Sequence, residues 1–318
     1  MKRQVLAVAS RLERKRQRQD LGDLQHLIVS ASTAAKYDRQ CAHFFEWMRG
    51  EEREPPRYFT EMDGAMSAYI ENCWQEGESK ANVTYTIAGL QHHCPTLRGH
   101  FPCSWRLLSA WSRHELPSRA PPLPQPLLLP FAGQALKYGS PDTALGVLLS
   151  FDGMLRTGEL FNLRCGDVAV APDGKTAVLN LGLTKGGSRR GVKESVIINH
   201  PVTLKVLRAR LLTSQPGDFL LARRSHHFRT VFKRICEGLG LQDFDFRPDS
   251  LRRGGATYDF QINQSMSGVC VRGRWANERT ARIYINEGLS ALTQIRLSAN
   301  SKKLSAKAAA HFTDVLTV

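Results

Sequence analysis

A cluster of six prolines separates the 318-residue chain into two parts. The prolines lie between Leu116 and Phe131, at positions 117, 121, 122, 124, 126 and 130. Proline lacks a backbone N–H and its ring clashes with the preceding helical turn, so a helix does not continue through such a segment. A proline-rich segment instead behaves as an extended, semi-rigid spacer. The sequence therefore predicts two domains joined by a linker at residues 117–131, although a surface loop of a single domain would fit the same pattern.

The part before the linker, residues 31–116, has the apolar periodicity of helices. Apolar residues recur there at steps of three and four in two stripes, Tyr37, Cys41, Phe44, Phe45 and Met48, and then Met62, Met66, Tyr69, Ile70 and Cys73. This spacing lines one face of a helix and is typical of a buried core. We expect an all-helical domain whose first helix is capped by Ser32 or Thr33.

The part after the linker, residues 132–318, is predicted to combine helices with a small sheet. Helical patterns occur at 142–151, 202–213, 225–238, 248–262 and 278–286. Two short runs, 177–183 and 194–198, indicate strands, and the glycine-rich segment 185–193 is predicted to join them as a hairpin. The expected fold is therefore mostly α with a small β-sheet, in two domains.

The chain carries a net charge of +15, which favours a polyanionic partner such as nucleic acid. Each phosphate that a cation neutralises releases condensed counterions, and this release drives binding. A charge that only promotes solubility, or a membrane surface as partner, is the alternative. Seven Lys or Arg lie within the first 20 residues. Residues 1–30 are therefore predicted to form a basic arm that contacts DNA, acts as an import signal, or is merely a solvated helix.

The sequence favours an intracellular protein, in the cytoplasm or nucleoid, or in the nucleus of a eukaryote. It has no run of about eighteen apolar residues and no secretory signal, so we expect no membrane association. Its seven cysteines are odd in number and widely spaced, which fits reduced thiols. One cluster of possible zinc ligands has a spacing that matches no common zinc finger, namely His92, His93, Cys94, His100 and Cys103. We therefore expect no metal and no cofactor.

Three separated segments carry residues that suit phosphodiester chemistry. They are Leu-Arg-Thr-Gly-Glu-Leu at 155–160, Ser-Leu-Arg-Arg-Gly-Gly-Ala-Thr at 250–257, and Gly-Arg-Trp-Ala-Asn-Glu-Arg-Thr-Ala-Arg-Ile-Tyr at 273–284. Arg156 and Arg252 have the geometry to fork onto the non-bridging oxygens of a phosphodiester. The phenol of Tyr284 is a nucleophile able to attack the phosphorus. Together these residues indicate cleavage of a DNA strand without a metal.

Residues 130–290 resemble the catalytic domain of the tyrosine recombinases, the phage-integrase family. The site of that family is spread along the chain as Arg, Lys, His-x-x-Arg, His or Trp, and Tyr. The matching residues here are Arg156, Lys185, Arg252, Trp275 and Tyr284. Glu159 follows the first arginine by three residues, as in many members, and Trp275 precedes Tyr284 by nine. One position departs from the pattern, because Asp249 stands where histidine is expected.

The resemblance implies a role for each matching residue. Arg156 and Arg252 would stabilise negative charge on the phosphate, with Glu159 orienting an arginine. Trp275 would donate its indole N–H to the phosphate. Lys185 would protonate the leaving 5′-oxygen, and Tyr284 would form a 3′-phosphotyrosyl link without ATP or metal. The four cations of the hairpin suit a phosphate backbone: Lys185, Arg189, Arg190 and Lys193.

Asp249 is the weak point of the resemblance. A carboxylate beside Arg156 and Arg252 should be ionised at neutral pH, and an ionised carboxylate accepts hydrogen bonds but donates none. Asp249 is therefore expected either to accept the proton of Tyr284 or to hold Arg252 in position. The alternative is that the site has lost its activity.

The function implied by the resemblance is site-specific recombination or integration of double-stranded DNA. A type IB topoisomerase, which relaxes supercoils, and a recombinase-derived protein that binds DNA without cutting it are the alternatives. Residues 31–116 would be the core-binding domain and residues 132–318 the catalytic domain, ending in a tail helix. Recombination would assemble a tetramer on paired DNA sites. An apolar face at 302–318 would dock on a neighbouring protomer, or within its own chain.

Overall fold

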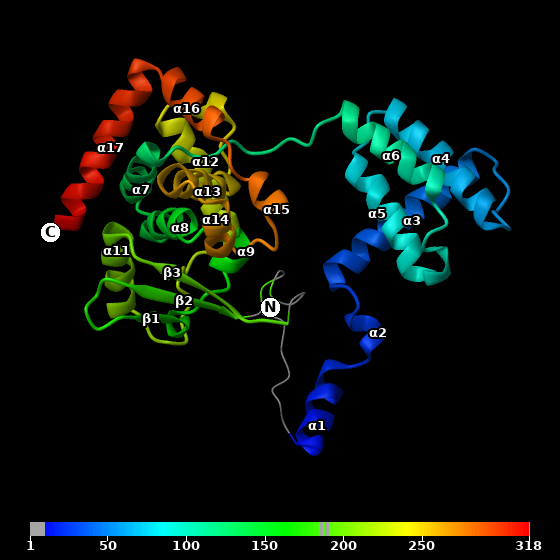
Figure 1. Cartoon of the computed structure of the whole chain (residues 1–318), viewed down its shortest axis with the longest axis horizontal. Helices are drawn as coiled ribbons and strands as arrows, with labels where there is room; N and C mark the ends of the chain where they lie inside the picture. The colour runs from blue at the N-terminus through cyan, green and yellow to red at the C-terminus, as the bar shows by residue number, and fades with distance from the viewer. Residues whose placement is uncertain (1–9, 183, 185–186, 188–190, 318) are drawn as a thin grey trace. The chain divides into compact units, whose positions relative to one another are not determined.

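The computed structural model describes residues 10–182, 184, 187 and 191–317. The chain forms two compact units, with the boundary between Ser118 and Arg119 (Figure 1). Most of the described residues are helical, and the larger unit also contains a three-stranded antiparallel sheet. The predicted fold class, mostly α with a small β-sheet, is confirmed. No helix in this described part of the chain is long and apolar enough to cross a membrane.

The smaller unit is all helical. Its elements are α1 (Arg11–Leu21), α2 (Leu24–Leu27), α3 (Ala31–Gly50), α4 (Phe59–Gln75), α5 (Lys80–His93), the 3-10 turn η1 (Pro95–Leu97) and α6 (Pro102–His114). Both predicted apolar stripes contribute to its core, in which Phe44, Met66 and Ile70 pack with Trp111. Phe45 differs from the expectation, because its side chain is 41% exposed.

Side-chain caps fix the starts of two helices in this unit. Ser30, and not Ser32 or Thr33, caps α3, because its hydroxyl accepts the backbone N–H of Thr33 at 3.3 Å. The buried carboxylate of Asp63 on α4 accepts the backbone N–H groups of Cys103 and Ser104 at 2.9 and 3.0 Å. These N–H groups have no acceptor within α6, since the first turn of a helix leaves its donors free. Asp63 therefore fastens the start of α6 to α4.

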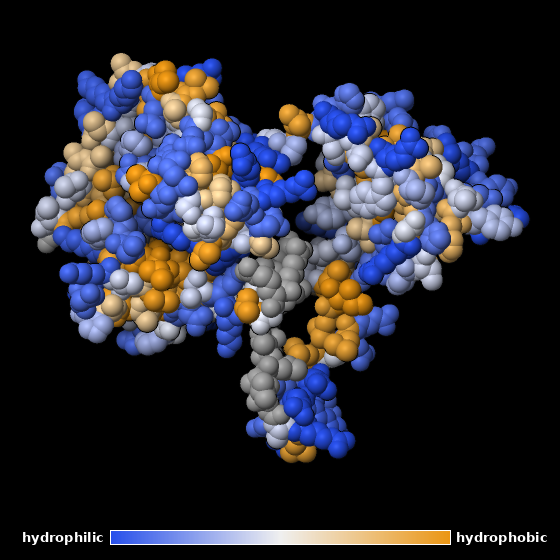
Figure 2. Space-filling view, in the orientation of Figure 1, coloured by the Kyte–Doolittle hydropathy of each residue, from blue (hydrophilic) through white to orange (hydrophobic). Residues whose placement is uncertain are grey.

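The N-terminal helix α1 packs on no core. Ser10 and Glu13 form a capping box at its start, and none of its residues is buried. Most of its surface is hydrophilic, although Leu12 is 62% exposed, whereas the following segment presents apolar side chains (Figure 2). Leu24 of α2 is 83% exposed and Ile28 is 61% exposed.

The larger unit begins with the 3-10 turn η2 (Gln125–Leu127). Its helices are α7 (Leu128–Lys137), α8 (Pro141–Asp152), α9 (Thr157–Leu160), α11 (Pro201–Leu212), α12 (Ser225–Gly238), α13 (Asp249–Asn263), α14 (Met266–Gly273), α15 (Glu278–Arg282), α16 (Glu287–Arg296) and α17 (Ala299–Thr317). Two further 3-10 turns are η3 (Cys165–Asp167) and η4 (Gln242–Phe244). The sheet has the order β1 (Val168–Val170), β2 (Ala177–Gly182), β3 (Glu194–Ile198), and Leu179 pairs with Val168 and with Val196. The two expected strands are present, and β1 is an addition to them.

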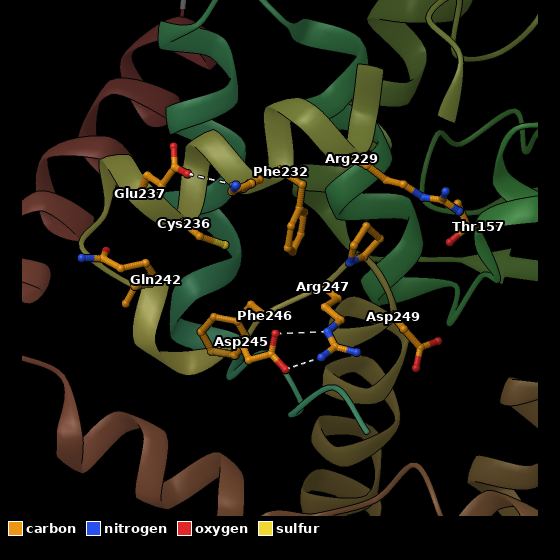
Figure 3. Close-up of a pocket in the computed structure, with 13 residues that line it drawn as sticks. Thr157, Arg229, Phe232, Cys236, Glu237, Gln242, Asp245, Phe246, Arg247 and Asp249 are labelled. Carbon is orange, nitrogen blue, oxygen red and sulfur yellow. Dashed lines mark hydrogen bonds and ion pairs between the residues drawn. The ribbon is translucent and has the colours of Figure 1, made fainter. Parts of the chain in front are cut away.

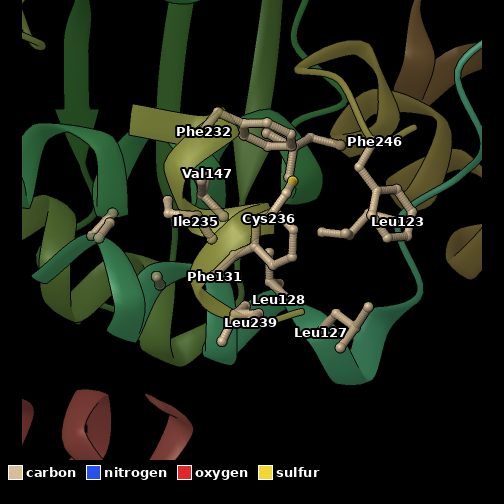
Figure 4. Packing of buried hydrophobic residues seen from close by; sticks show 14 of the residues in the cluster. Leu123, Leu127, Leu128, Phe131, Val147, Phe232, Ile235, Cys236, Leu239 and Phe246 are labelled. Atoms are coloured by element: carbon tan, nitrogen blue, oxygen red, sulfur yellow. The ribbon is translucent and has the colours of Figure 1, made fainter. Parts of the chain in front are cut away.

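The second half of the proline-rich segment belongs to the core of the larger unit. Leu123, Leu127, Leu128 and Phe131 are all at most 2% exposed and pack with residues of α8 and α12 (Figure 4). The structure therefore differs here from the expected spacer. The prolines at 126 and 130 lie at the start of η2 and in the first turn of α7. Proline is tolerated there, because the first turn of a helix has free N–H positions in any case.

The C-terminal helix α17 packs within its own chain, along α7 (Figure 1). Ala308 and Phe312 are 0% and 1% exposed in the core of the larger unit. The two backbones approach so closely that a Cβ on Gly133 of α7 would lie 1.9 Å from the carbonyl oxygen of Ala308. The same chain thus covers Ala308 and Phe312 of the apolar face expected at 302–318, which was one of the two alternatives, whereas Val315 is 47% exposed.

Candidate active site

The turn after α8 supplies carbonyl oxygens to two buried arginines. Met154 in this turn has a φ of 45°, which residues other than glycine rarely adopt. Its carbonyl oxygen accepts hydrogen bonds from Nη1 of Arg252 and, at 3.2 Å, from Nη2 of Arg274. The neighbouring carbonyl of Gly153 accepts Nη1 of Arg274 at 3.1 Å. The unusual backbone of this turn thus fixes the positions of two guanidinium groups.

Arg252 is a buried cation in the first half of α13. Its side chain is 1% exposed, and its Nη2 donates to the carbonyl oxygen of Gly273 at 2.8 Å. The guanidinium lies 4.6 Å from the ring centroid of Trp275, a cation–π distance. Burial, together with the positive charge of Arg156, lowers the pKa of Arg252 to about 10, so the group is still charged at neutral pH.

Glu159 is the shared anion of three arginines. It is the third residue of α9, and its carboxylate accepts the backbone N–H of Arg156 at 2.9 Å. The same carboxylate lies 2.7 Å from Nη2 of Arg274 and 3.8 Å from Nη1 of Arg252. Burial raises the pKa of Glu159, but these positive charges outweigh it and hold the pKa below its ordinary value of 4.5. Glu194 adds a second buried carboxylate, 3.8 Å from Nε of Arg274. Two carboxylates among three guanidiniums still leave this part of the site with an excess of positive charge.

The aromatic side chains Trp275 and Tyr284 pack against each other beside Arg252. Their ring centroids are 4.9 Å apart, with 43° between the planes. Trp275 is 5% exposed, and Tyr284 is partly buried. A Cβ on Gly273 would lie 1.7 Å from Cζ3 of Trp275, so only glycine allows the indole to lie where it does.

Tyr284 lies in a turn and not within a helix. The helix expected at 278–286 is interrupted: α15 ends at Arg282, and α16 begins at Glu287. Asn286 accounts for this break, because its side chain accepts the N–H of Leu289 at 2.9 Å and so begins a new helix. Asn277 begins α15 in the same way, by accepting the N–H of Thr280 at 2.9 Å. Tyr284 is thereby held between two capped helices.

Several buried donors of the site lack a protein acceptor among the described residues. They are Nε of Arg252, Nε of Arg253, Nε of Arg274 and Nε1 of Trp275. Buried N–H groups normally have hydrogen-bond partners, because an unsatisfied one costs free energy. Positive charge and free donors around a phenol suit the oxygens of a phosphate.

Asp249 forms no hydrogen bond or ion pair with these residues of the described part of the chain. It is the exposed first residue of α13 and borders a cavity of about 560 Å³ (Figure 3). Thr157 and Arg229 line the same cavity, and its walls include Phe232 and Phe246. Arg252 is held by Met154, Gly273 and Glu159, so the structure gives it partners other than Asp249.

The structure thus brings together five of the expected site residues: Arg156, Glu159, Arg252, Trp275 and Tyr284. Lys193 is exposed just before β3. Lys185, Arg189 and Arg190 lie outside the described residues. The sequence interpretation did not identify Arg253 or Arg274 as site residues. Arg274 follows a glycine and adopts a φ of 59°, and only the tertiary structure reveals that its side chain turns inward onto Glu159.

The histidines and cysteines of the possible zinc cluster have other neighbours. His100 stacks on Phe59 with 4.2 Å between ring centroids, and His93 lies 2.9 Å from a carboxylate oxygen of Asp38. Within the part of the chain that the structure describes, no group of three His, Cys, Asp or Glu has an arrangement that would hold a metal.

Comparison with solved structures relates the fold to DNA-recombining proteins. No protein-family model and no curated protein sequence matches the chain. Among solved structures, the Tn1549 transposon integrase in complex with transposon right end DNA gives a TM-score of 0.58 at 11% identity, over 92% of this chain and 96% of that one. A lambda integrase dimer bound to a core site gives 0.54 at 15% identity, over 83% and 74%. The XerH site-specific recombinase bound to a palindromic difH substrate gives 0.50 at 15% identity, over 71% and 68%. At these identities the likeness establishes a shared fold.

Proposed function

We propose that this chain, which has the fold of the tyrosine recombinases, is a site-specific DNA recombinase or integrase that cuts and rejoins DNA through a 3′-phosphotyrosyl intermediate. The grouping of Arg252, Trp275 and Tyr284 carries the proposal. The Arg252 guanidinium lies 4.6 and 5.4 Å from the two ring centroids. Among the described residues, Nε of Arg252 and Nε1 of Trp275 are buried donors without a protein acceptor. A phosphate oxygen beside the phenol would accept from both.

The proposed reaction assigns a task to each side chain. The phenol oxygen of Tyr284 bonds to phosphorus as the bond from phosphorus to the 5′-oxygen breaks. The phenol proton passes to solvent, since Tyr284 is only partly buried. Arg156 and Arg252 stabilise the charge that grows on the non-bridging oxygens, and preorganised donors of this kind act strongly in a buried site. The phosphotyrosyl bond retains the free energy of the phosphodiester, so a 5′-hydroxyl reverses the step and reseals the strand.

Lys185 is proposed to protonate the leaving 5′-oxygen. We also propose that the cations of the hairpin contact the phosphate backbone, namely Lys185, Arg189, Arg190 and Lys193. The general acid is needed because an alkoxide leaves poorly at neutral pH. A DNA substrate also implies an intracellular location, and exchange between two duplexes implies four protomers on paired sites.

Covalent trapping on nicked duplexes tests the proposal. A nick next to the scissile phosphate releases a short 5′-hydroxyl fragment, so resealing fails and the adduct accumulates. On a library of such duplexes we expect the full chain to form a DNA adduct that survives denaturation. Tyr284→Phe should form none and still bind the duplex, because only the nucleophilic oxygen is removed. An adduct in Tyr284→Phe, or its absence in the unaltered protein at every site, would contradict the proposal.

The products separate recombination from its two alternatives. Recombination joins strands from two sites, whereas a type IB topoisomerase relaxes supercoiled DNA without a partner site. A protein that only binds DNA would retard the duplex in a gel and form no adduct. The likeness to the XerH site-specific recombinase and lambda integrase favours recombination.

A further inference from the structure

Asp249 and Arg253 lie one turn apart on α13. The helix runs from Asp249 to Asn263, and residues four apart share a face of a helix. Asp249 is exposed, whereas Arg253 is only 5% exposed. Burial lowers the pKa of Arg253, and the negative charge of Asp249 partly offsets this change. The charge of Asp249 therefore acts on Arg253, the arginine next to Arg252 in the sequence, from one turn away on the same helix.

The guanidinium of Arg253 lies over the aromatic ring of Tyr284. It lies 5.6 Å from the ring centroid of Tyr284, and Arg252 lies 5.4 Å from the same centroid. Both distances are within the range of a cation over an aromatic ring. Two guanidinium groups therefore lie beside the ring of Tyr284. The sequence predicted Arg252 as a site residue but did not predict Arg253.

Arg253 also has an unused donor. Its Nε is buried and has no hydrogen-bond partner in the described part of the chain. Among the described residues, Arg119 also acts on Arg253, and the effect of its positive charge is repulsive. Two like charges side by side are unfavourable in the protein alone, and the exposed Asp249 offsets the charge of Arg253 only in part. An anion beside Tyr284 would accept a hydrogen bond from Nε of Arg253 and would reduce the repulsion between Arg253 and Arg119.

We infer that Arg253 is a second phosphate-binding arginine at Tyr284, and that Asp249 is a positioning residue that holds Arg253. This inference rests on the proposed function. It assigns Asp249 neither the proton of Tyr284 nor the orientation of Arg252. Arg252 is already fixed by the carbonyls of Met154 and Gly273 and by Glu159. In the reaction, Arg253 stabilises the charge on the non-bridging oxygens and takes no proton.

The test measures the rate of adduct formation by the full chain on a nicked duplex in single turnover. Arg253→Ala should slow this rate about 10²–10³-fold, the effect typical of removing one preorganised donor, while duplex affinity changes far less. Asp249→Ala should slow it less, and should add nothing when Arg253 is already alanine, because it acts through Arg253. Arg247→Ala is the matched control and should form the adduct at the wild-type rate. Arg247 is exposed, pairs with Asp245, and lines the cavity that Asp249 also borders.

A methylphosphonate at the scissile position separates a phosphate contact from a folding defect. The methyl group removes the charged oxygen that Arg253 is inferred to bind. The defect of Arg253→Ala should therefore shrink to less than about 10-fold on this duplex, whereas a misfolded protein would stay slow on both.

Three results would overturn the inference. An Arg253→Ala variant at the wild-type rate would do so, as would a defect of equal size on both duplexes. Additive losses from the Asp249 and Arg253 variants would show that Asp249 acts independently. In each case, the proposed function still holds if the unaltered protein forms an adduct. If the unaltered protein forms no adduct, both the proposed function and this inference are wrong.

Discussion

Replacing Glu159 with glutamine tests whether one carboxylate holds the site's arginines together. The substitution keeps the shape and removes the negative charge that Arg274 approaches at 2.7 Å and Arg252 at 3.8 Å. Glu159 and Arg274 have side chains that are 7% and 5% exposed, so this pair is buried. Breaking a buried pair by removing one partner typically costs about 3–5 kcal/mol. Glutamine still offers an oxygen to the N–H of Arg156, and we therefore expect a loss of about 3 kcal/mol at pH 7.

The pH dependence gives this prediction its sign. The pKa of Glu159 is lowered in the folded protein, so its ionised form contributes stability above the ordinary pKa of 4.5. That contribution disappears as the pH falls through the lowered pKa, because the unfolded state then binds more protons. The gap between the unaltered protein and Glu159→Gln should thus be largest above about pH 5 and shrink in acid.

Urea unfolding followed by circular dichroism, repeated from pH 7 to the lowest pH at which the protein stays folded, measures the gap. Glu237→Gln is the control, because Glu237 is an exposed partner of Lys233 at 3.9 Å and should contribute almost nothing. Equal stability of Glu159→Gln and the unaltered protein at pH 7, or a gap that does not shrink in acid, would refute the reasoning.

Two further substitutions test the packing that positions the site. Gly273→Ala should abolish adduct formation and destabilise the protein by about 1–3 kcal/mol or more, because its Cβ would overlap the indole of Trp275. Gly288→Ala is the control, because a Cβ there would have no atom within 4 Å, and it should be neutral or slightly stabilising in urea unfolding. Equal stability of the two alanine variants would contradict this contrast. Phe312→Ala should cost about 3–5 kcal/mol in urea unfolding of unbound protein, since Phe312 is 1% exposed in its own chain's core. If Phe312→Ala unfolds at the same urea concentration as the unaltered protein, α17 is not stably packed on α7.

The sequence was sufficient to predict which residues with specific chemistry lie together. Two arginines, a tryptophan and a tyrosine in a fixed order predicted a common site, and the structure brings these four side chains together. Apolar periodicity was sufficient for the helical core of the smaller unit. The grouping of these side chains and the helical core could be predicted because side-chain chemistry and periodicity had few alternative explanations, whereas the roles of the site residues stay predictions.

Other features depended on contacts that the sequence does not reveal. The helix at 278–286 was expected as one piece, yet Asn286 begins a new helix and leaves Tyr284 in the turn before it. The prolines near Phe131 suggested a spacer, but they lie where a helix start tolerates them, and the leucines between them are core. Asp249 was expected to accept the proton of Tyr284 or to hold Arg252, and this stays a prediction. Only the structure reveals that Arg253, one turn along α13, is a buried arginine on which the charge of Asp249 acts.

The balance of charge in the site connects its stability with its chemistry. Arg252 and Arg274 are buried and share the carboxylate of Glu159, and Arg274 also lies 3.8 Å from Glu194. Among the described residues, the exposed Asp249 partly offsets the charge of Arg253. Buried cations in excess of anions destabilise a folded protein, because desolvation is not repaid by pairing. The carbonyls of Gly153, Met154 and Gly273 compensate in part by accepting N–H groups. The remaining excess of positive charge lies beside Tyr284, where Arg252 and Arg253 are 5.4 and 5.6 Å from the ring centroid. In the proposed reaction, this is where the phosphate acquires negative charge during attack. A site built in this way should bind the transition state more tightly than the substrate, because the added charge then meets donors that are already in place.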